Sequence, residues 1–437
     1  MARSVRAIAL LKGSRNQAPI AYDPPSNEHY PRGEYCRCGT SPDTRIPMPV
    51  PETTTKPILV LNSGSSSLKF GVFSPAADSR NEDLFLEGSA EGIGRDSGSL
   101  QIRSADGQAL LSEDHLSQSQ PEALHTIASA LAQHLPSAPV AVGHRIVHGG
   151  PHLREHQLIT PDVLEQLRAA VHFAPLHVPQ SIALVEQAQK IWSDCPHFAC
   201  FDNAFHRTMP EVATHLPLPT KYFEQGVIRY GFHGLSCESI VYRLGDSLPP
   251  RAIFAHLGNG SSVTAVRDRK SIDTSMGLTP TGGVPMGTRS GDLDPGVLLF
   301  LLRSESLDSD ALEHLLNHDC GLTAFSNGES DMQALLKRAD AGDASANLAI
   351  DAFSTAVRKF IGAYAALMGG VDLLVFTGGI GQHSQPIRQR ICAGLGFLGL
   401  EDSSAKVDGS SKVKVLPTEE DLQIARHSRS LLQAMPA

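Results

Sequence analysis

The sequence predicts an α/β protein built from two related domains with a nucleotide-binding cleft between them. Two polar turns, 62–67 (NSGSSS) and 257–262 (LGNGSS), each lie between two apolar β-like runs and therefore indicate hairpins. Glycine lets backbone N–H groups approach a phosphate closely, and small polar side chains add further donors. One such turn is usually an ordinary hairpin tip, but two copies about one domain-length apart favour a duplicated ATP clamp. The single-loop phosphate motif G-x-x-x-x-G-K-[ST] is absent from the chain.

The composition fits a large folded enzyme and disfavours several other classes of protein. A chain of 437 residues with 41% hydrophobic residues and 38 glycines is long enough for two or three domains. Its net charge of −9 disfavours nucleic acid as a partner, and apolar runs such as 297–302 are too short to cross a membrane. Seven dispersed cysteines, an odd number, favour reduced thiols, and Cys36 and Cys38 lack a second pair of zinc ligands. We therefore expect a soluble, cytoplasmic protein.

Residues 1–55 differ from the rest of the chain. They are rich in Pro, Ser, Arg and Thr and show little hydrophobic periodicity, so we expect a disordered N-terminal extension. The basic first 20 residues faintly resemble a targeting peptide, but no hydrophobic segment typical of a secretory signal follows them. A plain tail, or a start codon assigned too far upstream, fits this segment better.

The first half alternates predicted strands and helices. Apolar runs predict strands at 58–61, 68–73, 138–143 and 198–201, and periodic patterns predict helices at 122–135, 161–173 and 179–192. Thr160, followed by proline, suits the start of the second of these helices. Arg145 follows one predicted strand and Asp202 follows another. Polar groups at the carboxyl ends of strands indicate a site in an open α/β sheet.

The second half starts near residue 206 and contains the repeated hairpin. Its predicted elements are strands at 252–257, 263–266 and 372–377 and helices at 345–368 and 419–432. Between them lies a loop at 273–296, rich in Gly, Thr and Pro, whose length suggests a functional role. The last predicted strand is followed by a glycine turn at 378–381. One stripe of the long helix is expected to be core: Leu348, Phe353, Val357, Phe360, Tyr364 and Leu367.

Eight motifs occur in a single order along the chain. They are 62–69 (NSGSSSLK), 143–150 (GHRIVHGG), 201–206 (FDNAFH), 230–234 (YGFHG), 256–260 (HLGNG), 286–295 (MGTRSGDLDP), 376–381 (FTGGIG) and 417–420 (PTEE). In this order they resemble the acetate kinases, a family of the sugar kinase, Hsp70 and actin superfamily. The resemblance covers residues 57–437 and implies two duplicated ribonuclease H-like (actin/Hsp70-type ATPase) domains with a central nucleotide cleft. The implied domains are 56–203 plus 420–437, on the acyl substrate and Mg²⁺ side, and 206–419, on the nucleotide side.

The resemblance also implies reversible transfer of the γ-phosphoryl group of ATP to acetate, giving acetyl phosphate and ADP. Such transfer relies mostly on positioning and charge stabilisation. A carboxylate that attacks an anionic phosphoryl group needs its repulsion offset, and the planar fork of arginine suits this task. Arg145 matches the family arginine that we assign to the acetate carboxylate, and Arg289 matches the one that we assign to the transferring phosphoryl group. A lone arginine would more often form a surface ion pair.

Further family positions supply histidines, an aspartate and metal ligands. His233 matches a donor to the transition-state oxygens, His177 a second support of this kind, and His256 a phosphate contact. Asp202 matches the catalytic aspartate, which orients groups or holds charge through Mg²⁺ and its waters, although an N-cap aspartate is the plainer interpretation. Asn62 and Glu420 fill the positions of the metal ligands, with Mn²⁺ as an alternative ion. These assignments rest on the resemblance.

The acyl and nucleotide sites follow from the same resemblance. The acyl positions are Arg145, Val147, Leu176, Phe232 and Pro280. The ATP positions are Lys69, His256, Leu257, Gly258, Asn259, Gly260, Asp331, Met332, Gln333, Gly379, Ile380, Gly381, Gln382 and His383. Because Val147 and Leu176 are of medium size, we expect acetate to be preferred over propionate. This selectivity should be graded, since one methylene is worth only about 1–3 kcal/mol.

The chain departs from the family pattern at six positions. They are Leu235, Cys237, Gln333, Gln382, His383 and Glu419. Gln333 replaces an arginine of the adenosine loop, which puts the affinity for ATP or the nucleobase preference in doubt. None of the six is among the residues assigned to phosphoryl transfer.

Two other functions remain open from the sequence. One is a propionate or other short-chain carboxylate kinase of the same family, which uses the same chemistry. The other is a non-catalytic nucleotide-binding homologue of the actin or Hsp70 kind, against which Arg145, Arg289 and His233 argue. The resemblance further implies a homodimer formed through the second domain, with no nucleic acid and no membrane as partner.

Overall fold

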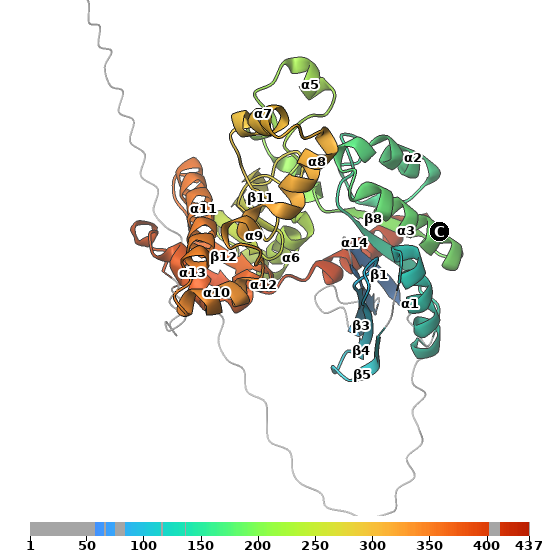
Figure 1. The fold of residues 1–437 in the computed structure, drawn as a ribbon. Helices are drawn as coiled ribbons and strands as arrows, with labels where there is room; N and C mark the ends of the chain where they lie inside the picture. Colours follow the sequence, from blue (N-terminus) through green and yellow to red (C-terminus); the bar gives the residue numbers. More distant parts are fainter. Residues whose placement is uncertain are drawn as a thin grey trace, which may run out of the picture. The chain divides into compact units, whose positions relative to one another are not determined.

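The computed structural model describes residues 57–64, 67–74, 84–114, 117–135, 137–401 and 411–436, all within one compact unit of the chain (Figure 1). The predictions for residues 1–55, for Cys36 and Cys38, and for positions 65 and 66 of the first turn lie outside these residues. Within the described part, no helix is both long enough and apolar enough to span a membrane.

Among the described residues, the first sheet has eight strands in the order β5-β4-β3-β2-β1-β6-β8-β7. Their bounds are β1 Ile58–Ser63, β2 Ser67–Phe73, β3 Leu84–Glu91, β4 Ser99–Ser104, β5 Ala109–Asp114, β6 Ala141–Ile146, β7 Gln157–Leu158 and β8 His197–Phe201. β1 and β2 form an antiparallel hairpin, which confirms the first predicted hairpin. β1, β6 and β8 run parallel, so the carboxyl ends of these three strands meet at one edge of the sheet.

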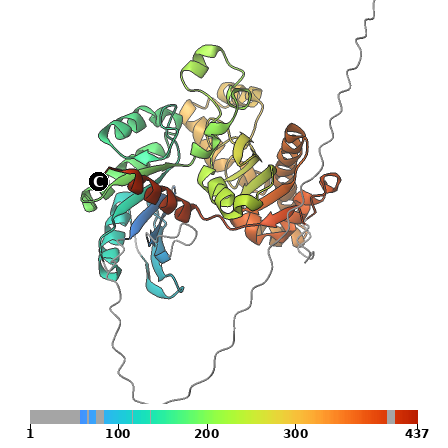
Figure 2. The same cartoon turned by 180° about the vertical axis from the view of Figure 1, so that it is seen from behind.

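Helices cover both faces of this sheet because the side chains of a strand alternate between its faces. Leu59 and Leu61 of β1 face a core that includes Leu124 of α1 (Gln120–His134) and Leu184 of α3 (Val178–Ile191). Val60, between them, packs with Ile424 of α14 (Glu420–Ala434) on the other face. The last helix of the chain thus covers this second face of the first sheet, as Figure 2 shows from behind.

The second sheet repeats this arrangement with five strands in the described part of the chain, in the order β11-β10-β9-β12-β13. Their bounds are β9 Arg251–Leu257, β10 Ser261–Arg267, β11 Lys270–Thr274, β12 Leu373–Thr377 and β13 Val413–Val415. β9 and β10 form the second predicted hairpin, and β9, β12 and β13 run parallel. The sequence β3-β2-β1-β6-β8 of the first sheet has the same strand directions, so the expected duplicated α/β fold is confirmed.

Two helices sandwich the second sheet. Ile253 of β9 packs in one core with Phe353 of α11 (Ala344–Met368), whereas Phe254 packs in another with Ile240 of α6 (Gly234–Leu244). The remaining α-helices in the described part of the chain are α2 Pro161–Ala169, α4 Glu211–Thr214, α5 Thr220–Glu224, α7 Pro295–Ser304, α8 Ser309–His314, α9 Gly321–Phe325, α10 Met332–Asp340, α12 Gly378–His383 and α13 Gln385–Cys392. In each half, therefore, the carboxyl ends of the parallel strands lie together at one edge of the sheet, between layers of helices.

Three local predictions need correction. Leu348 and Leu367 are exposed rather than core, because the buried face of α11 runs through Ile350, Phe353 and Val357 and both leucines are out of phase with it. The helix predicted to reach residue 173 ends earlier, and a 3₁₀ turn follows it. The predicted glycine turn at 378–381 is instead the first turn of α12.

Candidate functional site

The end of the first hairpin carries a network of polar side chains. Arg145, at the end of β6, donates from Nη2 to Oδ2 of Asp202, which directly follows β8, over 2.7 Å. Its Nη1 also donates to Oδ1 of Asn62 at 3.5 Å and to the carbonyl oxygen of Ser63 at 3.3 Å. The parallel order β1-β6-β8 places these residues side by side. The three predicted residues therefore form one cluster, in which Asp202 is fully buried.

The N-terminus of α14 closes this cluster with two more carboxylates. Asn62 donates from Nδ2 to Oδ1 of Asp421 over 2.7 Å, and the preceding residue is the predicted Glu420. Burial raises the pKa of Asp421, and the neighbouring Glu420 adds to this effect. Burial alone would lower the pKa of Arg145, but Asp202, Glu420 and Asp421 outweigh it and raise that pKa. Asp421 is a site residue that the sequence reasoning missed.

The donor set of this cluster fits a magnesium ion. Asn62, Asp202 and Glu420 offer amide and carboxylate oxygens, which are the ligands that Mg²⁺ prefers. Oδ1 of Asp202 is buried and, among the described residues, accepts no hydrogen bond. A buried carboxylate oxygen without a partner is unfavourable unless a cation or water satisfies it.

Two stacked histidines lie at the end of the second hairpin. His233 precedes α6, and its backbone N–H donates to Oδ2 of Asp202 at 3.3 Å. Its ring stacks on His256 with 4.1 Å between the centroids, and its Nδ1 lies 3.0 Å from Oγ of Ser262. Nδ1 of His256 lies 2.8 Å from Oγ of Ser236. Each ring thus keeps Nε2 free of these serine contacts.

Burial lowers the pKa of His233 well below its ordinary value, and His256, Arg145 and Arg289 add to this effect. Burial also lowers the pKa of His256, and Arg145 acts in the same direction. Both imidazoles are therefore neutral near pH 7. A neutral imidazole can donate one N–H to a phosphate oxygen.

The loop between β11 and α7 brings Arg289 to the same place. Nη1 of Arg289 donates to the carbonyl oxygen of Pro280 over 3.2 Å. A side chain at Gly260 would place its Cβ 3.5 Å from this Nη1 and 3.2 Å from Nε2 of His233, so glycine is the residue that lets the turn approach both. Burial lowers the pKa of Arg289, and the charge of Arg145 adds to the effect. Burial, then Arg289 and Arg145, lower the pKa of His177 to about 4.

Two arginines, whose positive charges repel each other, therefore lie beside three neutral histidines. Such an arrangement favours a bound anion, because the anion offsets the repulsion between the two guanidinium groups. The predicted catalytic residues Arg145, Asp202, His233 and Arg289 thus belong to one site.

A cavity of about 1070 Å³ adjoins this site. The predicted residues that line it are Asn62, Lys69, His256, Gly258, Asn259, Asp331, Met332, Gln333, Gly379, Ile380, His383 and Glu420. Leu257, Gly260, Gly381 and Gln382 do not line it, since Leu257 is buried in the core of the second sheet and the backbone oxygens of Gly381 and Gln382 accept from Arg388. The cavity is large enough for a nucleotide.

The predicted acyl residues are only partly brought together. Phe232 packs with Val147 and with two methionines that the sequence reasoning missed, Met276 and Met286. Pro280 reaches the site through the hydrogen bond from Arg289. Leu176 is 41% exposed and lies outside this apolar cluster.

The departures from the family pattern lie in different surroundings. Leu235 and Cys237 are buried in hydrophobic clusters. Glu419 forms an ion pair with Arg243 of α6, with 2.8 Å between Nη1 and Oε1. Gln333 lines the cavity, so its replacement of an arginine is the departure with the clearest bearing on a bound nucleotide.

Comparisons with known proteins agree over nearly the whole described chain. The model of the acetokinase family matches residues 57–426. The curated acetate kinase of Treponema denticola is 40% identical over 400 residues, which cover 86% of this chain and 100% of the relative. A crystal structure of Porphyromonas gingivalis acetate kinase gives a TM-score of 0.77 at 34% identity, and one of a Francisella tularensis propionate kinase gives 0.79 at 35%. Both structures cover 86% of this chain over their full length.

Proposed function

Because the chain belongs to the acetokinase family, we propose that it transfers the γ-phosphoryl group of ATP reversibly to acetate, giving acetyl phosphate and ADP. The observation that carries this proposal is the convergence of Arg145, Asp202, His233 and Arg289 beside the cavity. Their residue types suit an in-line transfer between two anions, which depends on positioning and on charge stabilisation.

The two arginines offset the repulsion between the attacking carboxylate and the phosphoryl group. Arg145, held by Asp202 and by the end of β1, binds the carboxylate of acetate. Arg289, held by the carbonyl of Pro280, contacts the equatorial oxygens of the phosphoryl group as their charge develops. Since the guanidinium groups keep fixed positions on different elements, they also align the acceptor with the phosphorus.

The neutral histidines act as hydrogen-bond donors. Nδ1 of His233 faces Ser262, and Nε2 faces the turn at Gly260, where a phosphoryl group would approach the second hairpin. His256 contacts a phosphate of ATP, and His177 supports the transition state from the side of the first sheet. Their lowered pKa values keep them neutral, so they donate without adding further positive charge to the two arginines.

Asn62 and Glu420 would hold Mg²⁺, or Mn²⁺ in its place, with Asp202 acting directly or through bound water. A divalent cation held there would neutralise negative charge on the phosphates of ATP. The free buried oxygen of Asp202 supports this assignment. Asp421 orients Asn62 through its hydrogen bond and adds negative charge beside the ion.

We assign the adenine nucleotide to the large cavity, between Lys69 of the first hairpin and the second-hairpin turn at Gly258 and Asn259. The predicted residues 331–333 and 379–383 would contact the nucleoside from the second half. Residues that only flank the cavity, such as Leu257 and Gly260, would act by shaping the turn.

The acceptor is proposed to be acetate rather than a longer acid. Val147 and Phe232, with Met276 and Met286, form an apolar wall next to the arginine site. Leu176 lies outside this wall and so does not close it, and one of the similar structures is a propionate kinase. Propionate is therefore the second candidate substrate.

The test is phosphoryl transfer from Mg·ATP to acetate, propionate and butyrate, with the acyl phosphate trapped as a hydroxamate. We expect the highest kcat/KM for acetate, with propionate roughly tenfold lower. Val147→Ala should shift the preference towards longer acids, whereas Val212→Ala, at a strongly exposed position, should not. Faster turnover of butyrate than of acetate, or no acyl phosphate from any acid, would refute the proposal.

A non-catalytic nucleotide-binding protein is the alternative from another class. It would bind ATP in the cavity and form no acyl phosphate. The retained arginines and histidines of the site weigh against it, since nucleotide binding alone does not need a second anion site.

We further propose a homodimer formed through the second half, 206–419, with the first domain composed of 56–203 plus 420–437. The separate sheet of each half and the packing of α14 on the first sheet support this division. The helix α7 exposes an apolar surface that another copy would cover, formed by Val297, Leu299, Phe300 and Leu302. Sedimentation velocity tests the dimer. Cys195, Cys200, Cys237 and Cys320 are free thiols, which supports a cytoplasmic location.

A further inference from the structure

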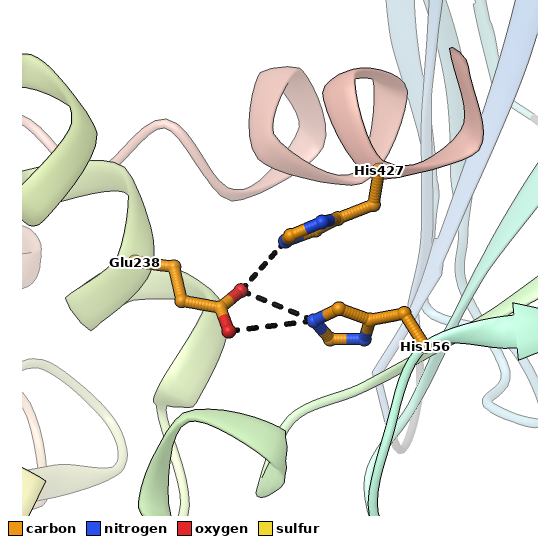
Figure 3. Close-up of side chains that lie close together, drawn as sticks. All are labelled: His156, Glu238 and His427. Carbon is orange, nitrogen blue, oxygen red and sulfur yellow. Dashed lines mark hydrogen bonds and ion pairs between the residues drawn. The ribbon is translucent and has the colours of Figure 1, made fainter. Parts of the chain in front are cut away.

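A carboxylate flanked by two histidines joins three elements away from the cavity. Glu238 of α6 lies between His156, in the segment before β7, and His427 of α14 (Figure 3). Nε2 of His427 is 2.7 Å from Oε2 of Glu238, and Nε2 of His156 is 3.2 Å and 3.4 Å from the two carboxylate oxygens. The two rings lie 4.0 Å apart, centroid to centroid. All three side chains are largely buried.

The backbone of β8 fixes the protonation of His156. The N–H of Phe201 donates to Nδ1 of His156 over 3.1 Å, so this nitrogen carries a lone pair. The ring proton is therefore on Nε2 and points at Glu238. Burial would raise the pKa of Glu238, but its hydrogen bonds from both histidines outweigh burial and lower the pKa to about 2. Glu238 is thus a carboxylate that accepts from His156. Nε2 of His427 contacts its Oε2 and also lies 3.0 Å from the amide nitrogen of Gln423.

This protonation pattern argues against a metal ion in the cluster. The ligand atoms are close enough to surround one. A neutral histidine that coordinates through Nε2 carries its proton on Nδ1 and donates it. Here Nδ1 of His156 already faces the N–H of Phe201, and two N–H groups would repel each other. The cluster is therefore a hydrogen-bonded bridge.

The bridge joins the elements that present the catalytic groups. Phe201 directly precedes Asp202. Helix α6, which carries Glu238, begins after His233, and the N–H of its first residue donates to the carbonyl oxygen of Asp202 over 2.6 Å. Helix α14, which carries His427, begins at Glu420. A shift of Glu238 would therefore move groups in both halves of the site.

We propose that His156 and Glu238 are positioning residues for phosphoryl transfer, in which Glu238 locks α6 to α14 and aims His156 so that it holds the end of β8 beside Asp202. This inference rests on the proposed function. Neither residue touches the substrate, so each acts through Asp202, His233 and Glu420. Misplacement of such groups by a fraction of an ångström is enough to slow an aligned reaction.

The charges around His156 define when the bridge opens. Burial lowers its pKa, Glu238 of α6 raises it, and His427 of α14 and Arg207, which follows β8, lower it. Protonation adds a proton to Nδ1, which can then no longer accept from Phe201. The positioning is therefore complete at neutral pH and is lost on acidification, below the ordinary pKa of histidine.

The first test compares His156→Ala with His156→Asn. Asparagine places an acceptor oxygen where Nδ1 lies, but it does not titrate in this range. We expect kcat to fall about tenfold in the alanine variant, with KM for acetate and ATP within about twofold, and to recover to within about threefold in the asparagine variant. In the pH profile of kcat, the asparagine variant should also lack the fall at acidic pH that His156 causes in the wild type. Equal kcat values in the two variants would overturn the proposal.

The second test is the pH profile of Glu238→Gln. Removal of the negative charge lowers the pKa of His156, so the acid limb of kcat should move to lower pH by roughly one unit. Glu211→Gln is the matched control, because Glu211 forms an exposed pair with His215 and should leave the profile unchanged. An unmoved acid limb in Glu238→Gln would contradict the positioning role, because a merely structural glutamate would change stability and not this limb.

Hydrogen exchange of the 197–203 segment gives a readout that does not need activity. Exchange should rise in His156→Ala and stay near the wild-type rate in His156→Asn. If the wild type forms no acyl phosphate, the proposed function fails while exchange still decides the positioning. Unchanged exchange in the alanine variant, or calorimetric binding of Zn²⁺ that disappears in His427→Ala, would overturn the inference.

Discussion

The two hairpins have the same strand directions and the same place in their sheets, yet different chemistry gathers at their ends. Asn62 of the first hairpin contacts Arg145 and Asp421, so carboxylates and an arginine surround it. The second hairpin contacts His233 through the hydroxyl of Ser262 and approaches Arg289 at Gly260. The first end suits a cation and the acceptor, and the second suits phosphate. The two hairpins therefore share one backbone arrangement but differ in chemistry, because a different helix or loop packs on the end of each.

Loss of Arg289 should break the phosphate side of this comparison and have the largest effect. Arg289→Ala removes a cation held against the second-hairpin turn, so kcat should fall about 10⁴-fold while binding of ATP stays nearly unchanged. Initial rates with acetate and calorimetry with ATP measure the two quantities. Arg168→Ala, at an exposed pair with Glu186, is the control. Unchanged turnover would leave Arg289 without its assigned role.

Asp202→Asn should break the cation side with the next largest effect. The substitution keeps the shape of the side chain but removes the charge that pairs with Arg145 and would face the proposed Mg²⁺. We expect kcat to fall about 10³-fold and the Mg²⁺ concentration for half-maximal rate to rise. A titration of the rate with Mg²⁺ measures this, with the exposed Asp319→Asn as control. An unaltered Mg²⁺ requirement would count against a metal role for Asp202.

The two sides differ in how far the sequence alone could predict them. Arg145 lies at the end of β6 and Asp202 directly follows β8, and parallel strands end at one edge, so their meeting could be predicted although the predicted strand 138–143 ended too early. The contact of Asn62 with Asp421 spans 359 positions, and nothing in the local pattern of either segment indicates it. The same holds for Glu238, whose two histidine partners lie 82 and 189 positions away. Only tertiary packing brings such groups together.

Side-chain exposure was the other quantity that the pattern did not determine. The stripe through Leu348 and Leu367 used the most hydrophobic residues of α11, whereas smaller ones such as Ala346 and Ala349 are buried against the sheet. Met276 and Met286 lie in the long loop, where no periodicity marks a core position. The hairpins, in contrast, were predictable because turn and strand signals are both local.

A fall in pH should affect the phosphate side more than the cation side, because the phosphate side depends on neutral imidazoles. His206 contacts the carbonyl of Phe232 and the hydroxyl of Ser271, and burial lowers its pKa from 6.5 to about 4. Folding favours the neutral form of His206. Its contribution to the free energy of unfolding is therefore complete above pH 6.5, and it is lost as the pH falls from 6.5 through about 4. The loss is on the order of 3 kcal/mol for this group.

Urea unfolding at several pH values between neutral and acidic measures this loss. His206→Gln, which keeps a donor near the position of Nε2 but does not titrate, should flatten the dependence on pH, and the exposed His314→Gln should not. An equally steep dependence in His206→Gln would assign the acid sensitivity to other groups.

Gln333→Arg should have the smallest effect and should sharpen the assignment of the nucleotide to the second side. Gln333 lines the cavity near the start of α10, so an arginine there adds a cation beside a polyanion. Because the position is exposed to solvent, we expect KM for ATP to fall only about threefold, with kcat unchanged. Gln333→Met, which adds no charge, is the control. The gain should shrink at high salt, since screening weakens an exposed attraction. A lower KM for ATP but not for GTP would place the arginine at the base, and an equally lower KM for both would place it at the phosphates. An unchanged KM at low salt would contradict a nucleotide in this part of the cavity.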